Sequence, residues 1–333
     1  MNIKYTLDDS AARLPLAIRS PEGVMDRVSD LRNSAGIHLV ELTTQHMLSM
    51  GFTLTDELTH YFDEGHATEA DPYELGTCYT HRRAYEDLLR DLTDPRPGLA
   101  ALHEVDELFP ASFKPDLQFL LALTVVGYPA FGYVRAYYDS EGETYHGMVI
   151  NIAQARPHVE EFTGEYSLAR LTNLIRYGFF NHEGFLLAYD TFYQTQGYNL
   201  DTFVWRLKTR LMSRGIAWYL SYRHDAAFYD ELLGIDAARM VDYVAYVNRM
   251  LADARNKRAL DDAVFEGWYR EHETGQPVEQ CVDMVGYYAA SAIAAEHGLN
   301  GLRDAIERGP NHFLALYNAL DVPPLESRAR SGE

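Results

Sequence analysis

The pair His182-Glu183 is the feature of this sequence best suited to chemistry. It lies in TNLIRYGFFNHEGFLLAYDTFYQ, residues 172–194, where apolar residues recur at the spacing of one helix face. His182 falls on that apolar face and Glu183 borders it. Such a pair is the first half of the HExxH motif, in which two histidines four residues apart bind zinc and the glutamate activates the metal-bound water. The pair therefore raises the hypothesis of a site derived from hydrolytic metal chemistry.

Helices are the elements that must position this pair. Ser167 is an N-cap residue type, so we expect a helix from there to about Tyr193. Further helices are expected at residues 201–220, 236–254, 260–272, 278–297 and 310–320. Gly298 stands where a C-cap glycine would end one of them.

A change of pattern ahead of these helices predicts a small sheet. Residues 119–126, 130–138 and 148–152 are rich in β-branched and aromatic types. The first hundred residues predict short helices, among them 36–50, 55–62 and 80–92. We therefore expect an α+β fold that is mostly helical, with a small antiparallel or mixed sheet followed by a helical half. The expected organisation is a helical region at 1–110, a sheet-plus-helices domain at 111–325 and a flexible tail at 326–333.

The order of these features resembles the zinc-dependent peptidases of the gluzincin type, over about residues 115–320. In that family a small sheet precedes a helix with an HExxH-like core, and a later helix with an EGxA-like segment supplies the third zinc ligand. The matching segments here are HEGFL at 182–186 and RGIA at 214–217. The resemblance continues through Gly286-Tyr287-Tyr288, Gly298, Leu302, Gly309-Pro310, Phe313 and Tyr317. It implies a zincin-like helical half with a cleft beside His182.

Two of the three zinc ligands that the resemblance implies are replaced in this chain. Leu186 takes the position of the second histidine, and Arg214 takes the position of the ligand glutamate. One imidazole does not hold zinc in a three-ligand site, and a guanidinium brings positive charge to the place of the cation. We therefore predict a degenerate site without a metal cofactor, and keep zinc as the alternative.

The resemblance also implies that Arg214 lies near His182 and Glu183. A guanidinium binds a carboxylate or a phosphate through two hydrogen bonds, so Arg214 is the predicted anion-binding group. Glu183 and His182 are the predicted catalytic groups, which move protons. The competing interpretation is that Arg214 only neutralises Glu183 in a site that has lost its function.

Three tyrosines extend the predicted site. The resemblance places the helix of Tyr287 and Tyr288 near the cleft, so we assign Tyr287 to substrate binding and Tyr288 to catalysis as an oxyanion donor. Tyr189 lies on the apolar helix face with His182 and is also assigned to substrate binding. Whether the protein is an enzyme stays open; if it is, we expect a hydrolase-like or acid/base enzyme derived from a zinc peptidase.

Three functions stay open on the sequence. The first is a metal-free cleft that binds or transforms a small anionic or peptide-like ligand. The second is a zinc-dependent peptidase or hydrolase with substitute ligands, for which His182, Asp190 and His224 are the candidates. The third is a non-catalytic structural or regulatory protein. A second histidine-glutamate stretch, HEVDE at 103–107, is polar and predicts a solvated loop or helix end.

Composition bears on partners and location. The 49 acidic and 29 basic residues give a formal net charge of -20, which disfavours nucleic acid and anionic membranes as partners. The uncharged stretch at 117–134 is interpreted as buried strands and not as a membrane helix. The first residues lack the apolar segment of a signal peptide, and two cysteines fit a reducing compartment, so we expect a cytoplasmic protein. The sequence does not indicate an oligomeric state.

Overall fold

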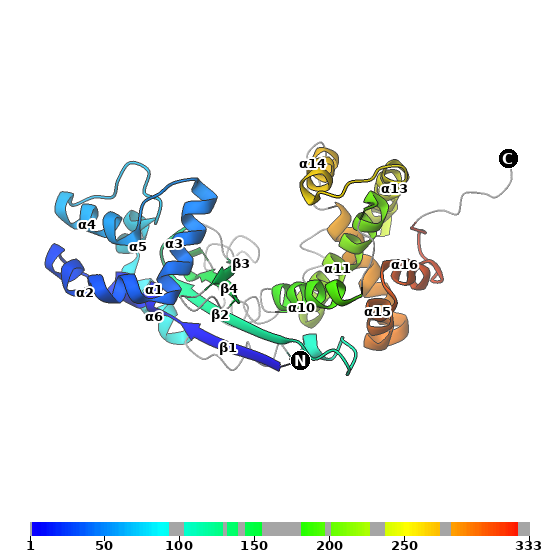
Figure 1. Cartoon of the computed structure of the whole chain (residues 1–333), viewed down its shortest axis with the longest axis horizontal. Helices are drawn as coiled ribbons and strands as arrows, with labels where there is room; N and C mark the ends of the chain where they lie inside the picture. The colour runs from blue at the N-terminus through cyan, green and yellow to red at the C-terminus, as the bar shows by residue number, and fades with distance from the viewer. Residues whose placement is uncertain are drawn as a thin grey trace. The chain divides into compact units, whose positions relative to one another are not determined.

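The computed structural model describes residues 2–92, 103–128, 132–138, 144–154, 181–196, 201–226, 237–273 and 281–325. The protein is mostly helical, which confirms that part of the expected fold class (Figure 1). The chain divides into two compact units. One consists of residues 1–99 and 115–173, and the other of residues 100–114 and 174–333.

A four-stranded sheet lies in the N-terminal unit. Its strands are β1 (Asn2–Asp8), β2 (Asp116–Thr124), β3 (Gly132–Tyr138) and β4 (Thr144–Asn151), in the order β1-β2-β4-β3. β1 and β4 both run parallel to β2, whereas β3 runs antiparallel to β4. Residues 120–123 of β2 are all buried. A continuous buried run of this kind is typical of a parallel strand that is covered on both faces.

Six helices of this unit fall within the described residues. They are α1 (Ser10–Ala17), α2 (Pro21–Asn33), α3 (Ala35–Leu48), α4 (Leu54–Glu64), α5 (Leu75–Thr80) and α6 (Arg82–Leu92). The N-cap residues of α2, α3 and α4 each accept a hydrogen bond from a backbone N–H group through their side chains; they are Ser20, Ser34 and Thr53. α1 and α3 pack against β2. These contacts bury the apolar residues of the strand.

The sheet belongs with the N-terminal helices, which corrects the expected boundary at residue 110. β1 lies in the region expected to be helical, and it pairs with β2 from Asn2 opposite Asp116 to Asp8 opposite Ala122. This long-range pairing ties the sheet to the first residues of the chain. By contrast, residues 100–114 group with the C-terminal unit. The expected tail at 326–333 lies outside the described residues.

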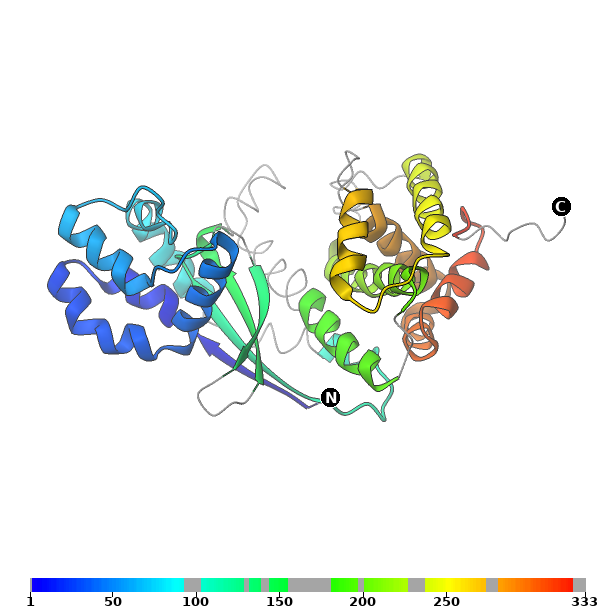
Figure 2. The same ribbon diagram turned by 45° about the horizontal axis from the view of Figure 1, so that its top comes forward.

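The C-terminal unit is built from helices (Figure 2). These are α10 (His182–Thr195), α11 (Phe203–Tyr222), the short 3-10 helix η2 (Arg223–Asp225), α13 (Ala237–Ala254), α14 (Asp262–Glu273), α15 (Cys281–Arg308) and α16 (Pro310–Asn318). α11 packs most extensively against α15 and also contacts α10, α13 and α16. Gly298 has a positive φ of 64° and kinks α15. The glycine therefore interrupts the helix where an end was expected, and a further helical segment continues to Arg308.

Two glycines set the distance between α11 and α15. A Cβ atom on Gly215 would overlap the backbone of Gly286, and a Cβ atom on Gly286 would overlap the backbone oxygen of Leu211. Only glycine lets two helix backbones approach this closely. The glycine pair therefore fixes the position of α11 against α15, and with it the positions of the side chains on the other faces of α11.

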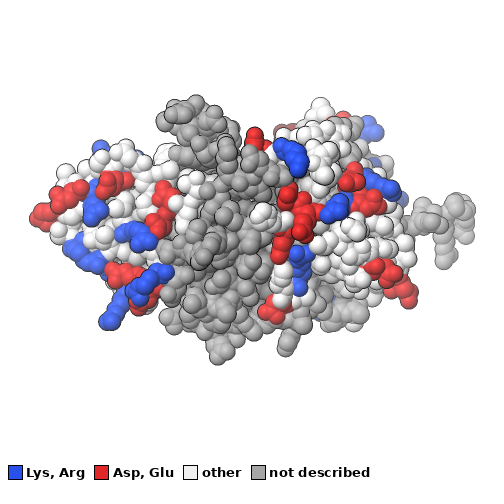
Figure 3. Space-filling view, turned by 90° about the horizontal axis from the view of Figure 1, so that it is seen from below, with Lys and Arg blue, Asp and Glu red and all other residues white. Residues whose placement is uncertain are grey.

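Acidic and basic side chains lie interspersed on the described part of the face in Figure 3. Within the described ranges, the structure contains no helix that is both long enough and apolar enough to cross a membrane.

We expect Gly215→Ala to lower the free energy of unfolding of the C-terminal unit by about 2–3 kcal/mol, because the added methyl group forces α11 and α15 apart. Gly267→Ala is the matched control: a Cβ there meets nothing within 4 Å, so the change should stabilise α14 by about 0.5–1 kcal/mol. Urea unfolding followed by tryptophan fluorescence reports on this unit, since the chain's 3 tryptophans, Trp205, Trp218 and Trp268, all lie in it. Equal midpoints for the two variants would contradict the close helix contact.

Candidate functional site

The predicted residues lie on two neighbouring helices of the C-terminal unit. α10 begins at His182, and α11 is capped by Thr202, whose side chain accepts a hydrogen bond from the backbone of Trp205. The two helices pack against each other. The helix start expected at Ser167 lies outside the described residues.

The structure brings His182 and Arg214 together. Nη1 of Arg214 lies 3.4 Å from Nε2 of His182, and the imidazole is only 4% exposed. The ring of Trp218, one turn after Arg214 on α11, meets the imidazole edge-on with 4.3 Å between ring centroids. Oγ of Ser221 lies 3.5 Å from Nδ1 of His182. His182 is thus enclosed by one face of α11.

The imidazole of His182 is neutral over the physiological pH range. Burial, together with the positive charge of Arg214, lowers the pKa of His182 to about 3. Because the guanidinium of Arg214 can only donate hydrogen bonds, Nε2 of His182 must be the acceptor. The proton of the neutral ring therefore lies on Nδ1. A ring with so low a pKa is a poor proton carrier near neutral pH, and its position suits it to orient Arg214.

Two carboxyl groups on α10 interact electrostatically with the guanidinium of Arg214. Glu183 is partly buried, and burial raises its pKa while the charge of Arg214 offsets only part of that rise. Much of the Asp190 residue is exposed, yet burial of its carboxyl group raises the pKa of Asp190, and the charge of Arg214 offsets only part of that rise. Yet among the described residues no carboxylate oxygen lies within the 4.0 Å of an ion pair with Arg214. The guanidinium is therefore close to both carboxyls and bonded to neither.

Arg214 differs in this respect from two arginines on the same face of α11. Arg206, Arg210 and Arg214 recur every four residues, which places them in one row along the helix. Arg206 pairs with Asp262 of α14, and Arg210 pairs with Glu266 of α14 at 2.8 Å. Among the described residues, the hydrogen-bond partner of the third arginine is the neutral imidazole of His182, and no carboxylate pairs with it.

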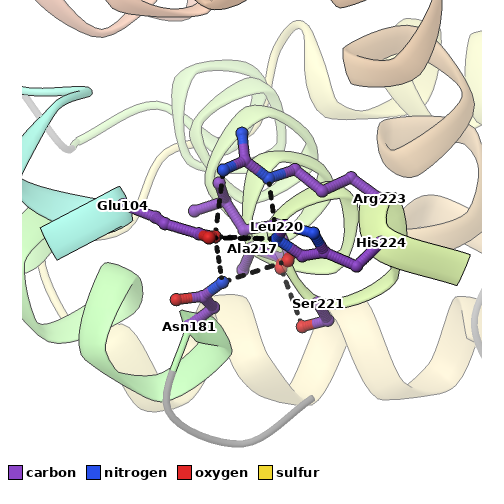
Figure 4. Close-up of polar contacts among 7 residues, drawn as sticks. All are labelled: Glu104, Asn181, Ala217, Leu220, Ser221, Arg223 and His224. Carbon is purple, nitrogen blue, oxygen red and sulfur yellow. Dashed lines mark hydrogen bonds and ion pairs between the residues drawn. The ribbon is translucent and has the colours of Figure 1, made fainter. Parts of the chain in front are cut away.

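A second polar network lies beside this site, at the end of α11 (Figure 4). One carboxylate oxygen of Glu104 accepts a hydrogen bond from Asn181 at 2.9 Å and forms an ion pair with Arg223 at 2.9 Å, and His224 lies 3.0 Å away. Partial burial opposes ionisation of Glu104. The hydrogen bonds from His224 and Asn181 and the charge of Arg223 outweigh it, so the pKa of Glu104 lies below its ordinary value.

This network includes residues that the sequence did not single out. Glu104 was expected in a solvated loop or helix end, but it is partly buried and joins the start of α10 to the end of α11. Asn181 is fully buried, and its amide donates to Glu104 and to the backbone of Leu220 at 3.2 Å. Only the polar stretch at 103–107 pointed to Glu104 in the sequence, and nothing pointed to Asn181.

The three predicted tyrosines have different surroundings. Tyr189 is buried and stacks on Phe185 with 5.9 Å between ring centroids. Tyr287 is buried and meets Tyr222, which in turn stacks on Trp218. These ring contacts connect Tyr287 to Trp218, which in turn contacts His182.

Tyr288 contacts a ring of another helix. It meets Tyr317 of α16 with 6.4 Å between ring centroids. Among the described residues it makes no hydrogen bond to His182, Glu183 or Arg214. The structure thus does not bring Tyr288 to the predicted proton-transfer groups.

The described side chains around His182 do not offer a set of zinc ligands. In the described ranges, no three histidine, cysteine, aspartate or glutamate side chains gather closely enough to hold a metal. The substitute ligands His182, Asp190 and His224 are accordingly not clustered, and His224 contacts Glu104 instead. Nε2 of His182 lies next to the guanidinium of Arg214.

Comparison with protein-family models, with curated proteins and with solved structures found no match to this chain. The resemblance to gluzincin-type peptidases therefore stays a prediction.

We expect His182 to make the C-terminal unit less stable in mild acid. Between about pH 6.5 and about pH 3 the unfolded chain binds a proton at His182 that the folded chain does not bind, so stability falls as the pH falls. The contribution is about 1.4 kcal/mol per pH unit below about pH 6. The raised pKa of Glu183 has the opposite effect, because it lowers the free energy of unfolding as the pH rises above 4.5. Glu183 is present in all three proteins compared below, so its effect does not distinguish them.

Urea unfolding of wild type, His182→Gln and the exposed control His297→Gln between pH 7 and pH 5 measures this effect. The free energy of unfolding should fall more steeply for the wild type and His297→Gln than for His182→Gln. Parallel slopes for all three would show that His182 is not buried in its neutral form.

Proposed function

We propose that the C-terminal unit binds a small carboxylate ligand at a metal-free site between α10 and α11, with Arg214 as the anion-binding group. One observation carries this proposal: Arg214 is partly buried, yet no described carboxylate forms an ion pair with it. A guanidinium removed from water without a negative partner is costly to the protein. A ligand carboxylate would supply that partner through two parallel hydrogen bonds.

The row of arginines on α11 supports this interpretation over simple charge neutralisation. The protein neutralises the other two arginines of the row with its own carboxylates. Asp262 pairs with Arg206, and Glu266 pairs with Arg210. Glu183 lies close enough to act on Arg214 electrostatically but forms no ion pair with it. A ligand carboxylate would therefore bind at the guanidinium of Arg214.

Glu183 is the group that would move a proton. Its raised pKa brings the protonated form closer to neutral pH, which suits a general acid or base. His182 would orient the guanidinium as a neutral acceptor. If the protein is an enzyme, acid/base chemistry at Glu183 on a substrate held by Arg214 is the reaction class that these residues support.

A structural role for the unit is the second candidate, and the aromatic packing favours it. Trp218, Tyr222 and Tyr287 form a continuous row of ring contacts between α11 and α15. Such a row suits a filled scaffold as well as the wall of a site. The two candidates differ in whether Arg214 binds an external anion.

Ligand-observed NMR and calorimetry with propionate and 3-phenylpropionate at pH 7 test the proposal. We expect binding by the wild type and a loss of roughly tenfold or more in affinity for Arg214→Gln, because the ligand loses two charge-assisted hydrogen bonds. Arg214→Lys keeps the charge without the paired donors and should be intermediate.

Arg210→Gln is the matched control, since it removes a guanidinium from the same helix face that already has a carboxylate partner. It should bind the carboxylates as the wild type does. Circular dichroism and thermal unfolding establish that each variant is folded. Absence of carboxylate binding, or equal binding by folded Arg214→Gln, would favour the structural role.

A further inference from the structure

We propose that Asp283 of α15 is a positioning residue for the Arg214 site. It holds the indole ring of Trp218 against His182, and so keeps Nε2 of His182 turned toward Arg214. The inference rests on the proposed function, because that function gives Arg214 its role.

Three contacts run in series from α15 across α11 to α10. Oδ2 of Asp283, in the first turn of α15, accepts a hydrogen bond from Nε1 of Trp218 at 3.2 Å. The ring of Trp218 meets the imidazole of His182 with 4.3 Å between centroids. Nε2 of His182 in turn lies 3.4 Å from Nη1 of Arg214. A change at Asp283 can therefore reach the guanidinium through two rings.

The polar contacts of His182 are too long to fix the orientation of its ring. Its nitrogens lie 3.4 Å from Arg214 and 3.5 Å from Oγ of Ser221, beyond the usual range of about 2.7–3.2 Å. Ser221 also donates its own proton to the backbone oxygen of Ala217 at 3.0 Å, so it can only accept from His182. The orientation of the imidazole therefore depends on its packing against Trp218.

The hydrogen bond to Asp283 orients the ring of Trp218. One face of the indole stacks on Tyr222 with 5.0 Å between ring centroids. Stacking is weakly directional, whereas a hydrogen bond to a carboxylate fixes the direction in which the N–H edge points. Asp283 thus selects the ring position in which Trp218 covers His182.

The second oxygen of Asp283 supports a role beyond packing. In the described part of the chain, Oδ1 is buried and has no hydrogen-bond partner. A buried oxygen of this kind lowers stability, and an apolar side chain of the same size would avoid the loss. The position therefore favours a strong acceptor for Trp218 over the most stable packing.

The ¹⁵N NMR signals of histidine-labelled protein test the inference, because they report the tautomer and the charge of each imidazole. The signals of His182 are identified by their absence in His182→Gln. In the full-length wild type we expect a neutral ring with its proton on Nδ1 from pH 7.5 to pH 5.5, since burial and the charge of Arg214 lower the pKa of His182 to about 3.

Asp283→Leu removes the acceptor and keeps a side chain of similar size. We expect mixed tautomers at His182 and a rise of about 2 in its pKa, so that part of the ring is protonated at pH 5.5, because water reaches a ring that Trp218 no longer covers. Asp283→Asn keeps an oxygen that can accept from Trp218, and it should retain the wild-type signals.

Asp253→Leu is the matched control. Asp253 accepts a hydrogen bond from Nε1 of Trp268 at 2.9 Å, so this variant loses the same kind of bond in the same unit. The ring of Trp268 contacts His272 with 4.6 Å between centroids, and the signals of His182 should stay as in the wild type.

Trp218→Phe tests the same hydrogen bond by removing its donor, and it serves if Asp283→Leu does not fold. It should also give mixed tautomers at His182, whereas Trp268→Phe should not. Circular dichroism establishes that each variant is folded. Wild-type signals of His182 in folded Asp283→Leu or folded Trp218→Phe would overturn the inference, and so would an equal change in Asp253→Leu.

Carboxylate binding separates this inference from the proposed function. We expect Asp283→Leu to bind propionate and 3-phenylpropionate roughly threefold or more weakly than Asp283→Asn does. Equal binding by these two variants would overturn the positioning role and leave the carboxylate site standing. Binding of neither carboxylate by the wild type would overturn the carboxylate site, while the signals of His182 would still show whether Asp283 orients the ring.

Discussion

The backbone contact between Gly215 of α11 and Gly286 of α15 is the constraint on which the C-terminal unit depends. Without side chains at these two positions, the helices pack at a distance that any larger residue would prevent. The contact fixes the rotation of α11 about its axis. Because Arg214 directly precedes Gly215, its side chain is directed by that rotation toward His182 on α10. Helix packing thus holds the guanidinium of Arg214 beside a neutral imidazole, a position that is unfavourable for its charge.

The polar groups around α11 differ in how fully they are satisfied. At the end of the helix, the carboxylate of Glu104 binds Asn181 and Arg223 and contacts His224, so its charge is paired and it connects the start of α10 to the end of α11. Around Arg214, the charges are close but unpaired. The paired charges at Glu104 connect the two helices, whereas in our proposal the guanidinium of Arg214 receives a ligand.

The sequence predicted the helices better than it predicted long-range contacts. Helical periodicity located α10 and α11, and the resemblance implied that Arg214 lies near His182, as the structure places it. Pairing of β1 with a strand more than a hundred residues away leaves no local pattern, so the sheet was grouped with the wrong helices. Glu104 was missed for the same reason, because a polar stretch gains its partners only when distant segments meet.

The most direct test of an unpaired Arg214 is a residue-specific titration of the Glu183 carboxyl group by ¹³C NMR, with its signal identified by its absence in Glu183→Gln. If the guanidinium is free to bind a ligand, burial dominates and the pKa of Glu183 lies above its ordinary value of 4.5 in the ligand-free protein. A pKa below 4.5 would mean that Arg214 already forms an ion pair with Glu183, and it would contradict the account.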